Sequence, residues 1–376
     1  MPRVLVTGAT GFIGVHLVRR LREAGDEVVC LVRRTSQRAA IEPFDVEFVE
    51  GDVGDPRSLA RAVAGCEVVY HLAGLTSALS RTDLHRVNAA GARNVAEACA
   101  TAPNPPVLVH VSSIAAAGPS PLNRPRTEHD PPAPVSHYGR SKLAGELAVR
   151  EFADRVPITI VRPPIVFGEG DRASLPLFAS VQRFGVHMAP LWRSRPFSFV
   201  HAAELAAALV AAANSAQRVQ PVERMRELVL SGQYSESMPI AATANGDTGV
   251  VDATGAGVYF AAFDELVTYA DFGRRIGRAL GVARTAVIPN VAPSVWMVAL
   301  GSEAIAQLRR RPMIFNLDKA REAVAGAWMC SSAALMRDTA WQPQKSLDER
   351  LAETAAWYRD QGWLPKPGLF VRLARQ

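Results

Sequence analysis

Short apolar runs alternate with longer stretches of helical spacing from Arg3 to Val161. The apolar runs lie at 3–7, 27–32, 46–50, 67–72, 107–111 and 158–161. Between them, apolar positions recur every three or four residues at 12–24, 56–64, 83–100 and 137–152. Strands that are apolar throughout and are separated by helices form parallel sheets with both faces covered. The pattern therefore predicts an α/β fold with a doubly wound parallel sheet of the Rossmann type.

The alternation of apolar runs with helical spacing becomes irregular after Gly168, which predicts a second, smaller region of mixed α/β structure. Helical spacing returns at 202–213, 269–280, 317–325 and 347–360, with an isolated apolar run at 258–262. Residues 218–256 are rich in Gly, Thr, Ser and Asp and predict a loop insertion, either a surface excursion or a lid over a substrate. We expect a first domain at 1–167, joined by returning segments near 199–214 and 257–264, and a second domain in the remainder of 168–376.

Composition limits the classes of function. The chain has 376 residues, 48% apolar residues and a formal charge of +6, and its arginines are dispersed. That balance predicts a solvated basic surface and no nucleic-acid partner. The four cysteines lack metal or redox spacing, as do the histidines and acids, so no metal site is expected. Buried thiols and a first strand without a preceding signal peptide predict a cytoplasmic protein.

The longest apolar stretch, 291–308, bears on membrane contact. Pro293, Gly301 and Glu303 interrupt it. It is too short and too polar to cross a bilayer, so no transmembrane segment is expected. A helix here could cover a pocket or rest on a membrane surface, which leaves peripheral membrane contact open.

A glycine-rich loop joins the first strand to the first helix. Gly8, Gly11 and Gly14 stand at G-x-x-G-x-x-G spacing, with Thr10, Phe12 and Ile13 completing the loop and opening the helix. Such glycines allow a tight turn, close approach of the backbone to a pyrophosphate, and close packing of helix on strand. The helix N-terminus adds amide donors and the positive end of its dipole. This arrangement predicts a dinucleotide-binding domain.

The end of the second predicted strand bears on which dinucleotide is bound. Dinucleotide sites for NAD usually carry an acid there, which binds the ribose 2′-hydroxyl. This chain has Val32 followed by Arg33 and Arg34. Arginine pairs a 2′-phosphate through charge-assisted hydrogen bonds. We therefore predict NADP as the preferred cofactor, with NAD as the alternative.

Lys142 is the only lysine that precedes Lys319 in the chain, and it stands one helical turn after Tyr138, at the i+4 position. Positions i and i+4 share one face of a helix, so the phenol and the ammonium point the same way. Free tyrosine has a pKa of about 10. A cation about 4 Å away stabilises a phenolate by about 4 kcal/mol at an effective dielectric of about 20. The pair therefore predicts a tyrosine that works as a general acid and base.

Taken in order along the chain, these motifs resemble the extended short-chain dehydrogenase/reductase family, also called the NAD-dependent epimerase/dehydratase family. Within it the sequence is most similar to the 3β-hydroxysteroid dehydrogenase and dihydroflavonol reductase branch. The resemblance rests on the glycine loop and on Asp52, Val53, Leu72, Ala73, Gly74, Asn88, Ser112, Ser113, Tyr138, Lys142, Pro163, Val166, Phe199, Val200 and His201.

The resemblance implies roles for these residues. Ser113 (with Ser112 as the second candidate), Tyr138 and Lys142 would be catalytic. The cofactor would also contact Ser112, the lysine and tyrosine, and the segments around Asp52, Gly74, Asn88 and Val166. Thr76, Phe197 and His201 are the expected substrate contacts. Relatives often dimerise through two helices, one of which corresponds to 137–152, so a homodimer is among the expected assemblies.

Three functions remain open. The favoured one is an NADP-dependent oxidoreductase that transfers a hydride between nicotinamide and a ketone or secondary alcohol of a small, fairly apolar substrate. The alternative is a nucleotide-sugar epimerase, although Phe197 and Ser198 replace the Arg-Asp pair of such enzymes and only Arg195 lies nearby. A cofactor-binding regulatory protein without activity is less favoured because Ser113, Tyr138 and Lys142 are all present. Ile114 and Ala115 replace the acidic pair of the family's dehydratases.

Overall fold

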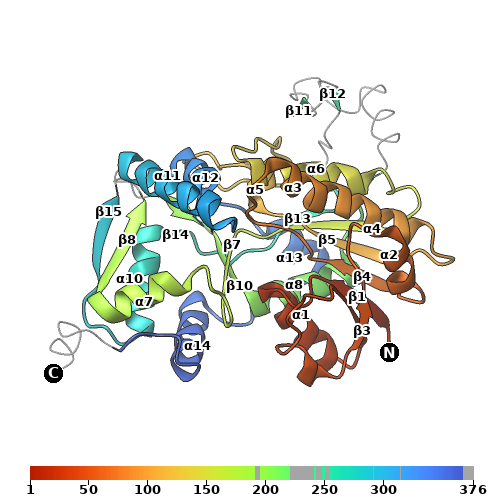
Figure 1. The fold of residues 1–376 in the computed structure, drawn as a ribbon, viewed down its shortest axis with the longest axis horizontal. Helices are drawn as coiled ribbons and strands as arrows, with labels where there is room; N and C mark the ends of the chain where they lie inside the picture. The colour runs from red at the N-terminus through yellow and green to blue at the C-terminus, as the bar shows by residue number, and fades with distance from the viewer. Residues whose placement is uncertain are drawn as a thin grey trace.

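A seven-stranded parallel sheet forms the centre of the protein in a computed structural model, which describes residues 1–190, 195–220, 241–242, 248–249, 255–290, 292–313 and 315–366 (Figure 1). Its strand order is β13-β6-β5-β4-β1-β2-β3. The strands are β1 (Arg3–Thr7), β2 (Glu27–Val32), β3 (Glu47–Glu50), β4 (Val68–His71), β5 (Val107–Val111), β6 (Ile158–Arg162) and β13 (Val258–Phe260). All six neighbouring pairs are parallel, which confirms the predicted doubly wound α/β class.

Helices cover both faces of this sheet, because each strand is apolar on both sides. Leu17 of α1 (Phe12–Glu23) and Leu205 of α8 (Ala202–Ser215) pack on one face, joined by α13 (Ala333–Thr339). Leu59 of α2 (Pro56–Val63), Val95 of α4 (Gly91–Ala100) and Val149 of α6 (His137–Arg150) pack on the other. In Figure 1 these two layers lie below and above the sheet.

The predicted helix at 83–100 is three segments. It begins as α3 (Arg81–His85), widens into a π-helical turn at η2 (Arg86–Ala90) and continues as α4. Apolar spacing does not distinguish a π turn from an α turn, so the sequence pattern missed it. Single π turns inside helices are common at functional sites, and this one carries the buried Asn88.

The rest of the chain forms a smaller region with short two-stranded sheets. These pair β7 (Ile165–Phe167) with β10 (Phe199–His201), β8 (Val186–Pro190) with β15 (Ala286–Asn290), and β9 (Pro196–Phe197) with β14 (Val267–Thr268). An aromatic core that includes Phe178, Phe272 and Tyr358 joins α7 (Leu175–Phe184), α10 (Tyr269–Ala279) and α14 (Leu347–Asp360). Helices α11 (Ala292–Arg309) and α12 (Leu317–Ala325) pack together beside it.

Four short elements complete the described chain: η1 (Glu42–Phe44), α5 (Ile114–Ala117), β11 (Ala241–Ala242) and β12 (Thr248–Gly249). The predicted insertion at 218–256 lies largely outside the described residues.

A buried ion pair fixes α6 against the sheet. The Glu146 carboxylate receives hydrogen bonds from Arg162 Nε at 2.9 Å and Nη2 at 2.6 Å, and from the Ser112 hydroxyl. Burial alone would raise the pKa of Glu146, but the Arg162 guanidinium, together with the Ser112 hydroxyl and Arg150, holds that pKa below its usual value. The side chain therefore stays ionised inside the protein and ties α6 to the ends of β5 and β6.

We predict that Arg162→Met destabilises the fold by about 3–5 kcal/mol, because it leaves the Glu146 carboxylate buried beside fewer donors. The matched control is Arg274→Met, which removes an exposed i,i+3 pair with Asp271 and should change stability by less than about 1 kcal/mol. Urea denaturation of both variants measures the difference. Equal, small losses would show that the buried pair does not hold α6.

Candidate active site

The glycine loop has the close contacts that a dinucleotide site requires. Gly8 has φ of +76°, and a Cβ there would lie 2.7 Å from the Ala73 amide nitrogen. A Cβ on Gly14 would lie 2.2 Å from the Gly8 carbonyl oxygen. Helix α1 begins after Gly11 with no side-chain cap and no acid in its first turn. Its N-terminus is therefore suited to an anionic group, and these residues fit the phosphates of a dinucleotide.

The loop after β4 lies beside the glycine loop. The Leu72 amide donates to the Thr7 carbonyl at 3.1 Å, and the Ala73 amide to Thr7 Oγ1 at 3.3 Å. Thr7 Oγ1 also bonds His71 Nδ1 at 2.7 Å. The Leu72, Ala73 and Gly74 predicted from sequence to line the cofactor therefore meet the glycine loop at the carboxyl end of the sheet, where ligands bind in such folds.

Arg33 and Arg34 follow β2 directly, and both are exposed. Within the described part of the chain neither has a carboxylate partner. The Gly51 amide donates to the Val32 carbonyl at 3.0 Å, so the segment with Asp52 lies next to the two arginines. Asp52 accepts a hydrogen bond from the Gly54 amide at 2.8 Å, and Val53 is buried beneath it. Both arginines are thus available to a group bound at this strand end.

Both polar groups of the Asn88 side chain form hydrogen bonds within the protein. Its Oδ1 accepts from the Leu75 amide at 2.7 Å, and its Nδ2 donates to the Leu75 carbonyl and to Ser141 Oγ, both at 2.9 Å. It therefore holds the loop carrying Gly74 and Thr76 against α6. Thr76 itself is exposed in that loop.

The structure distinguishes the two candidate serines. The Ser112 hydroxyl donates to Glu146, within the buried anchor of α6. Ser113 caps α5 by accepting from the Ala115 amide at 3.1 Å, and its side chain lies close enough to Tyr138 to lower the pKa of the phenol. Ser113 is thus the serine that lies with the tyrosine. The Ile114 amide donates to the Pro163 carbonyl at 2.9 Å, which brings Pro163 and the partly buried Val166 to the same strand ends.

Lys142 is buried one turn below Tyr138 on α6. Its Nζ donates to the Val111 carbonyl at 2.7 Å and lies 3.7 Å from where a Cβ on Gly74 would be. Burial lowers the pKa of Lys142 to about 8, and the Glu146 carboxylate opposes that shift. The ammonium therefore faces the cofactor-lining loop. The expected effect of this ammonium on the pKa of Tyr138 stays a prediction.

Lys319 is the cation that acts on Tyr138. Its Nζ lies 4.4 Å from the centre of the phenol ring and 2.8 Å from Glu322 Oε2. Burial raises the pKa of Tyr138, whereas the nearby Lys319 and Ser113 lower it. Only the helix at 317–325 was expected from sequence. Nothing in the local pattern links that segment to a tyrosine in the first half of the chain.

Helix α12 also caps α6. Asp318 accepts from the backbone amides of His137 at 2.7 Å and Tyr138 at 2.8 Å. Ser136, the N-cap of α6, donates its hydroxyl to Glu322 Oε1 at 2.6 Å. Carboxylates at a helix N-terminus satisfy free amides and oppose the helix dipole. The first turn of α6, which carries Tyr138, is therefore positioned by α12.

Two of the three predicted substrate contacts have partners inside the protein. His201 is fully buried: its Nδ1 accepts from the Ala203 amide at 3.2 Å, and its Nε2 lies 3.1 Å from Glu169 Oε2. These contacts give it a structural role at the start of α8 and leave its ring nitrogens unavailable to a substrate. Phe197 is buried in the aromatic core, where its ring meets that of Tyr269.

Comparison with known proteins places this site in a family. Residues 4–225 match the model of the NAD dependent epimerase/dehydratase family. The chain belongs to this family. It is 34% identical over 334 residues to a ceramide reductase of Caulobacter vibrioides, covering 88% of this chain and 87% of that protein. It is 32% identical over 218 residues to 3 beta-hydroxysteroid dehydrogenase type 7 of Homo sapiens, covering 52% and 58%.

A solved structure supports the fold. The dTDP-glucose 4,6-dehydratase DesIV from Streptomyces venezuelae, with NAD and TYD bound, superposes with a TM-score of 0.68 at 20% identity, covering 96% of this chain and 98% of that one. Family membership makes this chain an extended short-chain dehydrogenase/reductase that uses a nicotinamide dinucleotide for oxidoreductase or epimerase chemistry.

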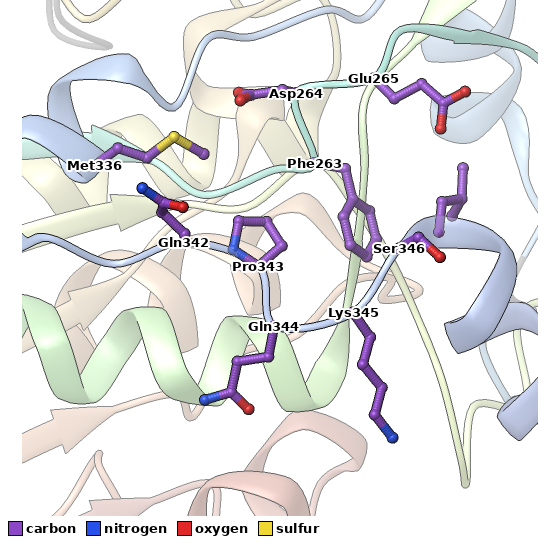
Figure 2. Close-up of a pocket in the computed structure, with 10 residues that line it drawn as sticks. Phe263, Asp264, Glu265, Met336, Gln342, Pro343, Gln344, Lys345 and Ser346 are labelled. Atoms are coloured by element: carbon purple, nitrogen blue, oxygen red, sulfur yellow. The ribbon is translucent and has the colours of Figure 1, made fainter.

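A separate hollow of about 420 Å³ contains none of the predicted site residues (Figure 2). Phe263, Met336, Pro343 and Lys345 are among its lining residues. Its floor is joined to α8, because Glu204 accepts from the backbone amides of Gln344 and Lys345. We assign this hollow no part in the chemistry of this protein.

Within the described residues, no helix is long and apolar enough to cross a membrane.

We predict that Lys319→Met shifts the pH dependence of alcohol oxidation to higher pH. Removing the cation raises the pKa of Tyr138, so the basic form needed to accept a proton appears only at higher pH. The pH profile of kcat/KM measures the shift. The control is Lys345→Met, whose ammonium pairs with Glu353 away from the tyrosine and should leave the profile in place. An unmoved profile in Lys319→Met would mean that Lys319 does not act on the phenol.

Proposed function

We propose that this protein is an NADP-preferring oxidoreductase that interconverts a ketone and a secondary alcohol on an apolar substrate. The observation that carries the proposal is that Ser113 lies close enough to Tyr138 to lower the pKa of the phenol, at the strand ends where Lys142 is held on the Val111 carbonyl. The three groups form a site for a substrate oxygen beside a dinucleotide.

Tyr138 moves the proton in this proposal. When bound, the nicotinamide supplies the hydride to the carbonyl carbon or accepts it from the alcohol carbon. In reduction the Tyr138 hydroxyl donates its proton to the carbonyl oxygen, and in oxidation the phenolate accepts the alcohol proton. The Ser113 hydroxyl hydrogen-bonds the same oxygen and orients it. Lys142, fixed on the Val111 carbonyl, would hold the ribose hydroxyls of the cofactor.

The surroundings of Phe197 favour this reaction over nucleotide-sugar epimerisation. Phe197 and Ser198 are buried, and Ser198 Oγ bonds the backbone of Cys330. Arg195, the remaining candidate for pairing a diphosphate, donates to the Val324 carbonyl at 3.2 Å. A substrate diphosphate would therefore lack the arginine that sugar-nucleotide enzymes of the family place here. Epimerase remains the second candidate because the family includes it.

Other family reactions have less support. The positions that carry acids in the dehydratases hold Ile114 and Ala115, which are buried and apolar, so no side chain there can shuttle water. A silent regulatory protein is disfavoured because Ser113, Tyr138 and Lys142 are retained together.

The relatives suggest the substrate class. A ceramide reductase is similar over most of both chains, and a 3 beta-hydroxysteroid dehydrogenase over about half of each. We infer a lipid-like ketone or secondary alcohol for this chain, which suits the replacement of the family's diphosphate-pairing arginine by Phe197.

The choice of NADP rests on Arg33 and Arg34. Both are exposed beside Asp52 at the end of β2, where the 2′ position of the adenosine ribose lies in such folds. Guanidinium groups pair phosphate through two parallel hydrogen bonds, which a 2′-hydroxyl cannot match.

We expect the protein to consume NADPH with members of a panel of long-chain and steroid-like ketones, and Tyr138→Phe to lower kcat about 100-fold or more. Loss of the hydroxyl removes the proton donor but leaves the cofactor contacts, so the Kd for NADPH should stay unchanged. Arg140→Gln, on the exposed face of the same helix, is the control. Near-normal turnover in Tyr138→Phe, or inversion of a UDP-sugar without net NADPH consumption, would overturn the assignment.

For the cofactor, we expect kcat/KM with NADPH to exceed that with NADH by roughly 10-fold or more, and Arg33→Ser/Arg34→Ser to remove most of that ratio by raising KM for NADPH alone. The control Arg57→Ser/Arg61→Ser changes two exposed arginines on α2 and should leave the ratio intact. A wild-type preference for NADH would contradict the prediction.

A further inference from the structure

Helix α11 exposes a broad and largely apolar face. Met297, Val298, Leu300, Ile305 and Leu308 are all exposed, from 44% for Ile305 to 86% for Leu308. At 100° per residue, Met297, Leu300 and Leu308 fall on one side of the helix, with Val298 and Ile305 beside them. Exposed Pro293, Gly301 and Ala304 fill the positions between, so this arc carries no charged side chain.

The opposite side of α11 is buried against α12. Val295, Ala299 and Ala306 are buried and pack with Ala320 of α12, with Trp296 and Phe315 against them. In Figure 1 the two helices lie side by side at the edge of the molecule. A surface helix normally turns its polar side outward. Here the outward side is apolar as well, and contiguous exposed apolar surface of this kind marks a binding face.

The strand before the helix also exposes apolar side chains. Ile288 of β15 pairs directly with Met188 of β8, and both side chains are exposed by more than 40%. Strand β15 ends at Asn290 and α11 begins at Ala292. Exposed apolar side chains are therefore found on both of these consecutive elements.

Positive charge borders this face. Arg309, Arg310 and Arg311 follow Leu308, and all three are exposed. In the part of the chain that the structure describes, none of them pairs with a carboxylate. Apolar side chains that insert at the headgroup boundary, next to arginines that attract anionic lipid, are the features of an interfacial helix.

We propose that α11 binds the surface of an anionic lipid bilayer, with its apolar arc in the headgroup layer and Arg309, Arg310 and Arg311 on lipid phosphates. A second copy of the chain fits less well. The outward arc of α11 offers no carboxylate, so self-association through it would leave the arginines unpaired. The face adjoins α12, whose Asp318 and Lys319 contact Tyr138. Only α12 would then separate the bound lipid from Tyr138. The binding itself does not depend on the proposed reaction.

The test is flotation of the purified full-length protein with vesicles of phosphatidylcholine alone or of phosphatidylcholine with phosphatidylglycerol. We expect binding to the anionic vesicles, weakened by salt. Arg309→Gln/Arg310→Gln/Arg311→Gln should weaken it by about fivefold per arginine. Met297→Ser/Leu300→Ser/Leu308→Ser should abolish binding to the anionic vesicles. Because these side chains are exposed, melting temperature and turnover of a water-soluble ketone should not change.

Two matched controls use exposed residues elsewhere. Leu122→Ser/Phe184→Ser removes exposed apolar side chains, and Arg57→Gln/Arg61→Gln removes exposed arginines. Both should float like the wild type. The proposal is overturned if the wild type does not bind anionic vesicles, or if the α11 variants bind as well as the controls. It is also overturned if light scattering shows a dimer that Met297→Ser/Leu300→Ser/Leu308→Ser dissociates while vesicles stay unbound.

Discussion

The position of α6 depends on carboxylates that act on it from two sides. Glu146, ionised in the interior by Arg162, ties the helix to the ends of β5 and β6. Asp318 of α12 satisfies the amides at its first turn. A buried carboxylate is costly unless it is fully paired, so these contacts allow few alternative placements of the helix. Because Tyr138 and Lys142 lie on α6, the placement of this helix fixes their positions.

Two lysines lie near the site, and only Lys142 was expected there from the sequence. Lys142 is buried on the Val111 carbonyl and faces the loop at Gly74, where a ribose would lie. Lys319 sits over the Tyr138 ring and opposes the rise in pKa that burial causes. The tyrosine's acidity is therefore set partly by the C-terminal region, the same region that is expected to shape the substrate site. Substitutions in α12 would therefore change the pKa of Tyr138 and the shape of the expected substrate site together.

The parallel sheet and the glycine loop could be predicted because their signals are local. Apolar runs define the strands, and Gly8, Gly11 and Gly14 meet steric needs within one turn of chain. The π turn at Asn88 could not be predicted because apolar spacing does not separate it from an α turn. The contacts of Lys319 and Asp318 with Tyr138 could not be predicted for another reason: they join segments that lie far apart in the sequence. His201 looked like a substrate contact, yet its pairing with Glu169 depends on tertiary packing that no motif reveals.

The central claim is that hydride passes between nicotinamide and an apolar ketone while Tyr138 moves the proton. The most direct test supplies a long-chain ketone with NADPH deuterated at the transferable C4 position and analyses the product by mass spectrometry. Hydride transfer predicts one deuterium on the carbinol carbon of the alcohol product for each NADP formed. Failure to form any deuterated alcohol, together with a UDP-sugar that is inverted without net formation of NADP, would rule this reaction out.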